Sequence, residues 1–353
     1  MTELRGLTSA RGIAAWLVVL YHIRLSIAGL PAPLIAALGK GYLAVDFFFL
    51  LSGFVIWLAW HDRLREGGAA TIARFLQKRI ARIWPLHAFM LAAAAALALL
   101  LAATGRADSA FPAAELPLHL LLVQNWGLTS DLNWNDPAWS ISCELAAYLL
   151  FPLLVMSTDW RRMRTTTLLA LASGLLLALH IIMRDQPTLG SDIPRFGLLR
   201  CLTEFITGTI VAALWQRTRV VWAPATGAAL LLTLWAAGAV ETLVVPAALA
   251  LLLLALATHN RQRAMSGIIA RGLHRLGEIS YATYLSHFLL WKLFKLAFVR
   301  DSTAVAPPMI ALYLLLVLAA SAGLYRLVER PAQRWINARA IRRPRPRVLP
   351  RAR

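Results

Sequence analysis

The 353-residue sequence has little charge and little cysteine. Charged residues make up 15% and hydrophobic residues 59% of the chain, whereas a soluble domain has about 25% and 45–50%. The two cysteines, Cys143 and Cys201, both lie in apolar stretches, which excludes a disulfide framework and metal-ligand spacing. Solenoid repeats, glycine-rich phosphate loops and the nucleophile elbow of serine hydrolases are absent from the sequence. The composition therefore predicts a polytopic membrane protein.

Apolar stretches of about 17–24 residues, each long enough to cross a ~30 Å hydrocarbon core as a helix, recur along the chain. They cover residues 7–29, 41–60, 83–104, 137–157, 165–183, 196–216, 222–238, 240–258, 279–298 and 307–325. The predicted fold class is all-α, a membrane bundle of about ten transmembrane helices. For the short pair at 222–238 and 240–258, a re-entrant hairpin is the alternative. The first stretch is longer than the apolar region of a signal peptide, so we expect it to be retained.

The distribution of lysine and arginine predicts the orientation in the membrane. Of the 36 basic residues, 26 lie before the first stretch, after the last one, or in every second loop between them, and only five lie in the opposite loops. Cytoplasmic loops carry the excess of positive charge, so both termini are predicted to be cytoplasmic. The predicted location is the inner (cytoplasmic) membrane, with the lipid bilayer as the surrounding partner.

The net charge of +19 follows mostly from this loop asymmetry and from a basic C-terminal segment. We expect residues 1–335 to form the membrane domain and residues 336–353 to form a disordered cytoplasmic tail close to anionic lipid. A nucleic-acid-binding function is disfavoured, because no basic face belongs to a soluble fold.

The first apolar stretch contains an arginine and a histidine, Arg11 and His22, that are eleven residues apart. Ionisable groups inside a membrane span are costly and usually functional. Eleven residues of α-helix return a side chain to nearly the same face about 16 Å further along the axis. The two residues therefore cannot touch, but both can line one groove, with Arg11 near the cytoplasmic surface and His22 deep in the membrane.

Two carboxylates are predicted to lie at nearly the depth of His22. Helix rise places His22 roughly 20 Å above the cytoplasmic edge, and Asp46 and Glu144 roughly 8 and 10 Å below the outer edge. The alternative for His22 is a hydrogen-bonded packing role. Asp46 could equally be the structural partner of an arginine.

Four further polar residues within the spans are candidates for a site or for packing. His287 is predicted near the middle of its span, where catalysis and packing are equally plausible. Arg200 and Glu204 are spaced i, i+4, and we expect them to neutralise each other. Cys143, next to Glu144, is interpreted as buried packing and not as a nucleophile.

Together these residues belong to a set of motifs in which the chain resembles acyltransferase family 3, the integral membrane proteins that O-acylate bacterial polysaccharides and related molecules. The arginine–ten residues–histidine pattern is Arg11 to His22. The other matching motifs, in order, are Val45–Phe54, Arg79–Pro85, Trp139–Glu144, Gly277–His287 and Glu329–Pro331. The resemblance extends to about residue 335. Many relatives have two adjacent acidic residues where this chain has Glu144 and Leu145, so only Glu144 inherits that role. Some relatives carry a fused extracytoplasmic domain, which we do not expect here.

The resemblance implies an enzyme, an acyl-CoA-dependent O-acetyltransferase that uses acetyl-CoA as co-substrate and no metal. A neutral imidazole is suited to taking a proton from a hydroxyl group, so His22 is predicted to be the general base. Glu144 or Asp46 is predicted to hold its other ring nitrogen, as in a catalytic triad.

The donor and acceptor sites are predicted beside the helix face that carries Arg11 and His22. Because the planar fork of arginine suits phosphate oxygens, Arg11, with Arg79 and Arg82, is predicted to hold the nucleotide of acyl-CoA. The predicted acceptor is an extracytoplasmic carbohydrate such as exopolysaccharide or lipopolysaccharide. Candidate acceptor contacts are Trp139, Ser142, Tyr284 and His287, with the aromatic loop residues Trp126 and Trp134. The alternatives are acylation of a small-molecule glycoside and a transporter of acyl donor or solute without chemistry of its own.

Overall fold

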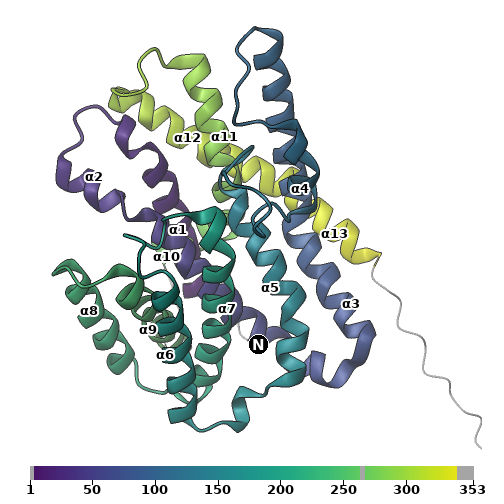
Figure 1. Ribbon diagram of the computed structural model, residues 1–353, viewed down its shortest axis with the longest axis vertical. Helices are drawn as coiled ribbons and strands as arrows, with labels where there is room; N and C mark the ends of the chain where they lie inside the picture. The colour runs from purple at the N-terminus through teal and green to yellow at the C-terminus, as the bar shows by residue number, and fades with distance from the viewer. Residues whose placement is uncertain (1–3, 263–266, 340–353) are drawn as a thin grey trace, which may run out of the picture.

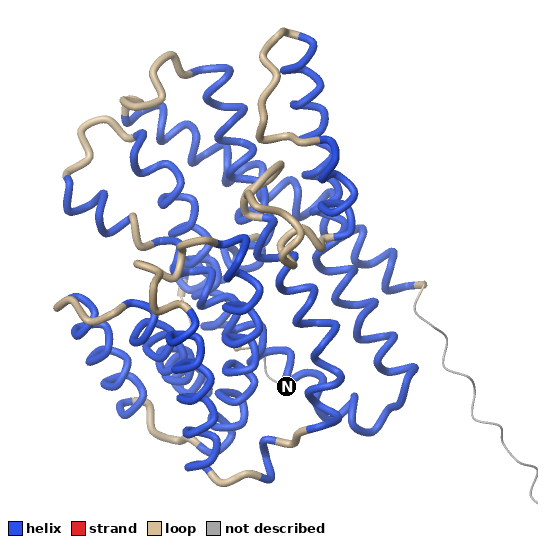
Figure 2. The backbone as a smooth tube through the Cα atoms, in the orientation of Figure 1, coloured by secondary structure: helices blue, strands red, loops and turns tan. Residues whose placement is uncertain are grey.

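The computed structural model describes residues 4–262 and 267–339, and every regular secondary-structure element in that part of the chain is a helix (Figures 1 and 2). The α-helices are α1 (Arg5–Ile23), α2 (Ala32–Leu38), α3 (Ala44–Ala103), α4 (Leu116–Leu121), α5 (Ala138–Ser157), α6 (Thr165–Ile182), α7 (Ile193–Arg217), α8 (Trp222–Ala236), α9 (Glu241–Gln262), α10 (Ile268–Glu278), α11 (Ser280–Phe298), α12 (Pro307–Leu324) and α13 (Arg330–Ala338). The all-α prediction is confirmed.

Seven helical segments among the described residues are long and apolar enough to cross a membrane. Their outer faces carry large apolar side chains exposed outside the bundle, such as Leu169, Leu177 and Ile181 on α6. These features indicate a multi-pass membrane protein, because lipid covers such an apolar surface and helices satisfy their own backbone hydrogen bonds inside the bilayer. The helix α8, in the pair that sequence left uncertain, has only 15 residues.

The long helix α3 consists of two arms joined at Gly68. This glycine has φ of +61°, a conformation that side chains with a Cβ atom rarely adopt. The arms pack against each other, with the rings of Trp60 and Phe75 5.3 Å apart. The expectation of a basic loop at 61–82 is therefore wrong, because this segment is helical apart from the turn at Gly68. Its alanine, arginine, leucine and lysine residues are good helix formers that extend each span.

The first arm of α3 crosses α7 at very short distance. A Cβ atom added to Gly53 would lie 1.9 Å from the carbonyl oxygen of Phe205, and one added to Gly208 would lie 2.0 Å from that of Leu50. Small residues permit such close backbone approach in membranes, where packing and not the hydrophobic effect joins helices. This crossing fixes the first arm of α3 beside α7.

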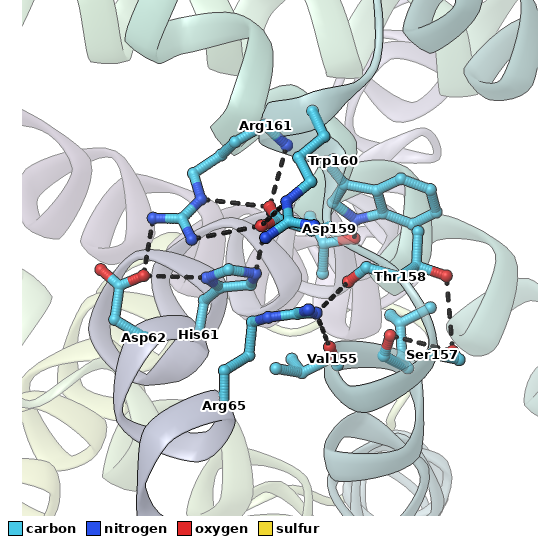
Figure 3. A network of polar contacts seen from close by, with 12 residues as sticks. His61, Asp62, Arg65, Val155, Ser157, Thr158, Asp159, Trp160 and Arg161 are labelled. Carbon is cyan, nitrogen blue, oxygen red and sulfur yellow. Dashed lines mark hydrogen bonds and ion pairs between the residues drawn. The ribbon is translucent and has the colours of Figure 1, made fainter.

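Polar contacts tie the end of that arm to the segment after α5 (Figure 3). Arg161 Nη1 lies 2.6 Å from Asp62 Oδ1, and its Nε lies 3.1 Å from Asp159 Oδ1. His61 contacts both carboxylates, and Arg65 donates to the carbonyl oxygen of Val155 at 2.7 Å. Burial favours the neutral acid of Asp159, but bonds from Arg161 outweigh it and hold the pKa of Asp159 below its ordinary value.

Several short helices were not expected from the sequence. They are α2, α4, α10 and α13, which are too short to span a bilayer. A π-helix, Tyr325–Glu329, joins α12 to α13. Because α13 continues to Ala338, the domain boundary expected at residue 335 falls inside a helix. Most of the expected tail, residues 340–353, lies outside the described residues.

Candidate active site

Two histidines from distant parts of the sequence meet between α1 and α11. His22 Nδ1 lies 3.2 Å from His287 Nε2 and 2.9 Å from the carbonyl oxygen of Val18. His287 Nδ1 in turn lies 2.7 Å from the carbonyl oxygen of Tyr284. His287 is fully buried, and His22 is partly exposed.

These contacts determine the tautomers of a neutral pair. A carbonyl oxygen only accepts hydrogen bonds, so Nδ1 of His287 must carry its proton and its Nε2 then offers a lone pair. His22 Nδ1 donates one proton, shared between Val18 and His287, which leaves the lone pair on His22 Nε2. That nitrogen is the atom of the pair with the chemistry of a general base.

The partner of His22 therefore differs from the one predicted. Neither Glu144 nor Asp46 forms a hydrogen bond with His22 among the described contacts. The depth estimate from span edges located each residue along the membrane normal only approximately. It carried no information about which helices are neighbours. His287, predicted as an acceptor contact, is instead the side chain that lies beside His22 Nδ1.

Arg11 lies on the same side of α1 as His22, since Arg11 contacts the end of α10 and the start of α11 and His22 contacts α11. Arg11 Nε donates to Ser280 Oγ, and its Nη2 donates to the carbonyl oxygen of Gly277, each at 3.1 Å. The guanidinium fork is thus fixed where α11 begins, while His22 lies further along that helix.

A cavity of about 160 Å³ opens beside Arg11, enclosed by α1, α5, α11 and both arms of α3. The three arginines predicted to bind the donor, Arg11, Arg79 and Arg82, all line it. Its other polar side chains are Ser52, Ser140, Glu144, Tyr148, Ser280, Tyr281 and Tyr284. The cavity is smaller than the ~300 Å³ of a typical ligand pocket, so it has room for a slender group but not for a nucleotide.

Glu144 belongs to this cavity and not to the histidine pair. Ser52 Oγ donates to Glu144 Oε1 at 2.5 Å. Ser52 comes from the first arm of α3 and Glu144 from α5, so the bond joins two walls of the cavity. Ser52 was part of the Val45–Phe54 motif but was not identified as a site residue from the sequence.

A second carboxylate, Glu329, pairs with Arg82 from the second arm of α3. The π-helix that ends at Glu329 brings this side chain into the bundle, where it is 1% exposed. Pro331 lacks the N–H that an α-helix would donate to Leu327, which accounts for the irregular turn. The Glu329–Pro331 motif was the only sequence signal for this residue.

Arg11, Arg79 and Arg82 outnumber the carboxylates Glu144 and Glu329, so the cavity has a formal net positive charge. Arg82 is matched by Glu329, and Arg11 bonds only neutral groups. Arg79 Nε is buried without a hydrogen-bond partner among the described residues, and its guanidinium lies 5.9 Å from the Tyr148 ring centre. A buried donor without a partner is costly, so an anionic or carbonyl oxygen would be stabilised here.

Asp46 forms a different buried pair. Arg200 Nη2 lies 2.7 Å from Asp46 Oδ1, and neither side chain is more than 1% exposed. The direct ion pair of Arg200 is therefore with Asp46 and not with Glu204, although the charge of Glu204 still acts on Arg200. Neither oxygen of Glu204 has a hydrogen-bond partner in the described part of the chain. Asp46 matches the structural alternative, since its arginine lies across the α3–α7 crossing.

Two predicted acceptor residues face the protein interior. Trp139 is 6% exposed and packs against Phe49 and Arg200. Ser142 is fully buried, and its Oγ accepts the backbone N–H of Asn125 at 3.2 Å. Trp139 thus packs against α3 and α7, and Ser142 holds the segment before α5, so neither side chain lies open to an acceptor. The loop tryptophans, Trp126 and Trp134, donate their indole N–H to the carbonyl oxygens of Ser142 and Pro112.

Tyr284 connects the cavity to the histidine pair. Its hydroxyl lies 2.7 Å from Ser140 Oγ at the cavity wall, and its ring centre lies 6.2 Å from that of His287. The cavity and the histidines therefore follow one another along α11. No cluster of three or more metal-ligating side chains occurs among residues 4–262 and 267–339.

Comparison with known proteins identifies relatives across most of the chain. The family profile described as "Acyltransferase domain", of acyltransferase family 3, matches residues 4–326. Acyltransferase MdmB of Streptomyces mycarofaciens is 32% identical over 337 residues, covering 85% of this chain and 82% of that protein. "Protein 2 in picA locus" of Rhizobium radiobacter is 39% identical over 158 residues, covering 41% of this chain and 78% of that protein.

A Staphylococcus aureus (strain COL) protein named "Putative O-acetyltransferase" is 23% identical over 232 residues, covering 61% of this chain but only 35% of its own length. No solved structure matches the chain significantly.

Proposed function

Because the chain belongs to acyltransferase family 3, we propose that it moves an acyl group, in the first instance acetyl, from cytoplasmic acyl-CoA to a hydroxyl of an extracytoplasmic carbohydrate. The observation that carries this proposal is the order of groups along α11. The arginine-lined cavity lies at the start of that helix, and the His22–His287 pair follows it.

The proposed orientation places the cavity towards the cytoplasm. Ten membrane spans with both termini cytoplasmic are obtained if each arm of α3, α8 and α11 crosses the bilayer together with the remaining long helices. The unequal distribution of basic residues supports this orientation. Arg11, Arg79 and Arg82 then face the compartment that supplies acyl-CoA.

The donor would enter by its thin end. A cavity of about 160 Å³ accommodates an acetyl thioester and part of the pantetheine arm, while the nucleotide stays at the cytoplasmic surface. Arg79 Nε, which lacks a partner among the described residues, is a candidate donor to the thioester or amide oxygens of that arm. The arginines are thus proposed to bind the arm and the adjoining phosphates, and not the whole nucleotide.

The proposed chemistry uses the free lone pair of His22. Nε2 takes the proton of the acceptor hydroxyl as its oxygen attacks the thioester carbonyl carbon. The tetrahedral intermediate collapses, the carbon–sulfur bond breaks, and the proton passes from His22 to the departing CoA sulfur. His287 Nε2 accepts the Nδ1–H bond of His22 throughout, which stabilises the imidazolium without a carboxylate.

The test uses the purified full-length chain in liposomes with acetyl-CoA labelled in the acetyl group and a bacterial polysaccharide fraction. Free CoA and labelled glycan are both measured. Wild-type protein should produce both in equal amounts, and His22→Ala should form them at least about a hundredfold more slowly. Arg184→Gln, an exposed outer-loop change, should match the wild type.

Other outcomes would identify the alternatives. Label appearing on an added small-molecule glycoside but not on the polysaccharide would change the acceptor class. Movement of intact acetyl-CoA or solute into the liposomes without CoA release would contradict the enzyme proposal in favour of a transporter.

A further inference from the structure

A second depression lies between the C-terminal ends of α3 and α11, which both lie at the top of the molecule in Figure 1. It has a volume of about 640 Å³, four times that of the arginine-lined cavity. In the proposed orientation it opens on the extracytoplasmic side. None of the site motifs contributes to it, and the proposed donor path does not reach it.

Four cations line this depression: Arg106, Lys292, Lys295 and Arg300. Asp108 is the one carboxylate in its lining, and it lies 3.8 Å from Lys292, so three positive charges remain unmatched within the lining.

This concentration is unusual for an outer face. The orientation rule leaves few cations there, and the others are Arg24, directly after α1, and Lys40, Arg184 and Arg195 in the outer loops. Two of these have acidic partners, since Lys40 pairs with Glu241 and Arg184 with Asp185.

The floor of the depression is apolar. Leu97 and Leu101 of α3 are buried beneath it, and Leu296 of α11 and Val299, directly after that helix, form the opposite wall. A soluble anion gains no binding energy from apolar side chains, whereas an amphiphile buries its chain against them and leaves its charged head among the cations.

The depression is connected to the histidine pair through Lys292. Lys292 follows His287 by five residues, about 7.5 Å along α11. Its Nζ lies 5.6 Å from the ring centre of Phe288, and that ring contacts His22 edge to face with centres 5.3 Å apart. A head group held by the outer cations would therefore place the groups attached to it close to His22.

We infer that this depression binds the acceptor through an anionic phosphate group, and that the acceptor is an amphiphile, a carbohydrate carried on a lipid phosphate. Arg106 and Arg300 hold phosphate oxygens, the lipid chain lies along the leucine-lined floor, and the sugar extends past Lys292 to His22. This inference rests on the proposed function for the identity of the acceptor, but the binding site is defined independently of acyl transfer.

The test is direct binding of radiolabelled dodecyl phosphate to the full-length chain in phosphatidylcholine nanodiscs, with empty nanodiscs subtracted. The test variant is Arg106→Gln/Arg300→Gln. The matched control is Arg184→Gln/Arg195→Gln, which removes two exposed cations from the same outer layer. Both pairs are at the surface, and equal thermal unfolding midpoints would establish that both variants fold.

The wild type and the control should bind the probe saturably with equal Kd, and the test variant should bind about tenfold more weakly. Excess inorganic phosphate should compete poorly, because it lacks the chain. Equal Kd values in all three proteins would overturn the inference. So would inorganic phosphate competing as well as unlabelled dodecyl phosphate, which would make the depression a free-anion site.

Failure of the two proposals can be told apart. Charge-dependent probe binding without any labelled glycan would reject the acyl-transfer proposal alone. Labelled glycan formed by a protein that does not bind the probe would reject the phosphate site alone.

Discussion

Replacing His287 with phenylalanine tests the histidine pair most directly. The change keeps a ring of similar shape in a fully buried position but removes the Nε2 acceptor that lies 3.2 Å from His22 Nδ1. The carbonyl oxygen of Val18, at 2.9 Å, still accepts that proton, so the tautomer of His22 is retained. What is lost is one hydrogen bond to the imidazolium formed in the transition state.

The expected loss follows from that single bond. A hydrogen bond to a charged group contributes about 1.5–3 kcal/mol, which corresponds to roughly a tenfold to hundredfold decrease in kcat. Removing the base itself, with His22→Ala, should cost about 10²–10⁴-fold. The conservative His287→Gln variant, whose amide oxygen can replace Nε2 as acceptor, should recover most of the activity.

The assay is single-turnover release of CoA at saturating acetyl-CoA, with each variant matched for insertion and thermal midpoint. Because residues that act as one unit are not additive, the double variant His22→Ala/His287→Phe should be little slower than His22→Ala alone. Losses that multiply, or a His287→Phe protein as active as the wild type, would refute the orienting role.

Three further predictions follow from the cavity and the loop network. Arg11→Lys should raise KM for acyl-CoA about tenfold with little change in kcat, because an ammonium cannot bond both Gly277 and Ser280 as the guanidinium group does. A change in kcat alone would argue against donor binding by Arg11. Arg82→Gln should lower the thermal midpoint more than Glu329→Gln, because it removes the ion-pair partner of a carboxylate that is 1% exposed, whereas Arg82 is 27% exposed and can reach water. Equal shifts of the midpoint in detergent solution would contradict this. Because the pKa of Asp159 is lowered in the folded state, its carboxylate stabilises the fold at pH values above its ordinary pKa near 4, and this stabilisation is lost as the pH falls through the folded-state pKa. Asp159→Asn should therefore destabilise the protein at pH 7 and have progressively less effect below about pH 4, as measured by thermal unfolding.

The sequence was sufficient for the class of protein and for several residues that the structure brings together. Long apolar stretches predict membrane helices because the bilayer core cannot satisfy an open backbone. The cost of intramembrane charge singled out Arg11, His22 and His287, which face one helix–helix contact in the structure. The motif arginines Arg79 and Arg82 likewise line one cavity with Arg11.

Tertiary structure alone decided which of these residues are partners. His22 contacts His287 across 265 residues, and Arg82 reaches Glu329 across 247. Helix rise estimates the depth of a residue in the bilayer, but it does not determine how each helix is rotated or which helices are neighbours. Those properties depend on close crossings such as the one at Gly53 and Gly208, where the shapes of two helices must fit each other. The predicted bond from Glu144 to His22 failed for this reason: similar depth does not place two side chains on facing surfaces.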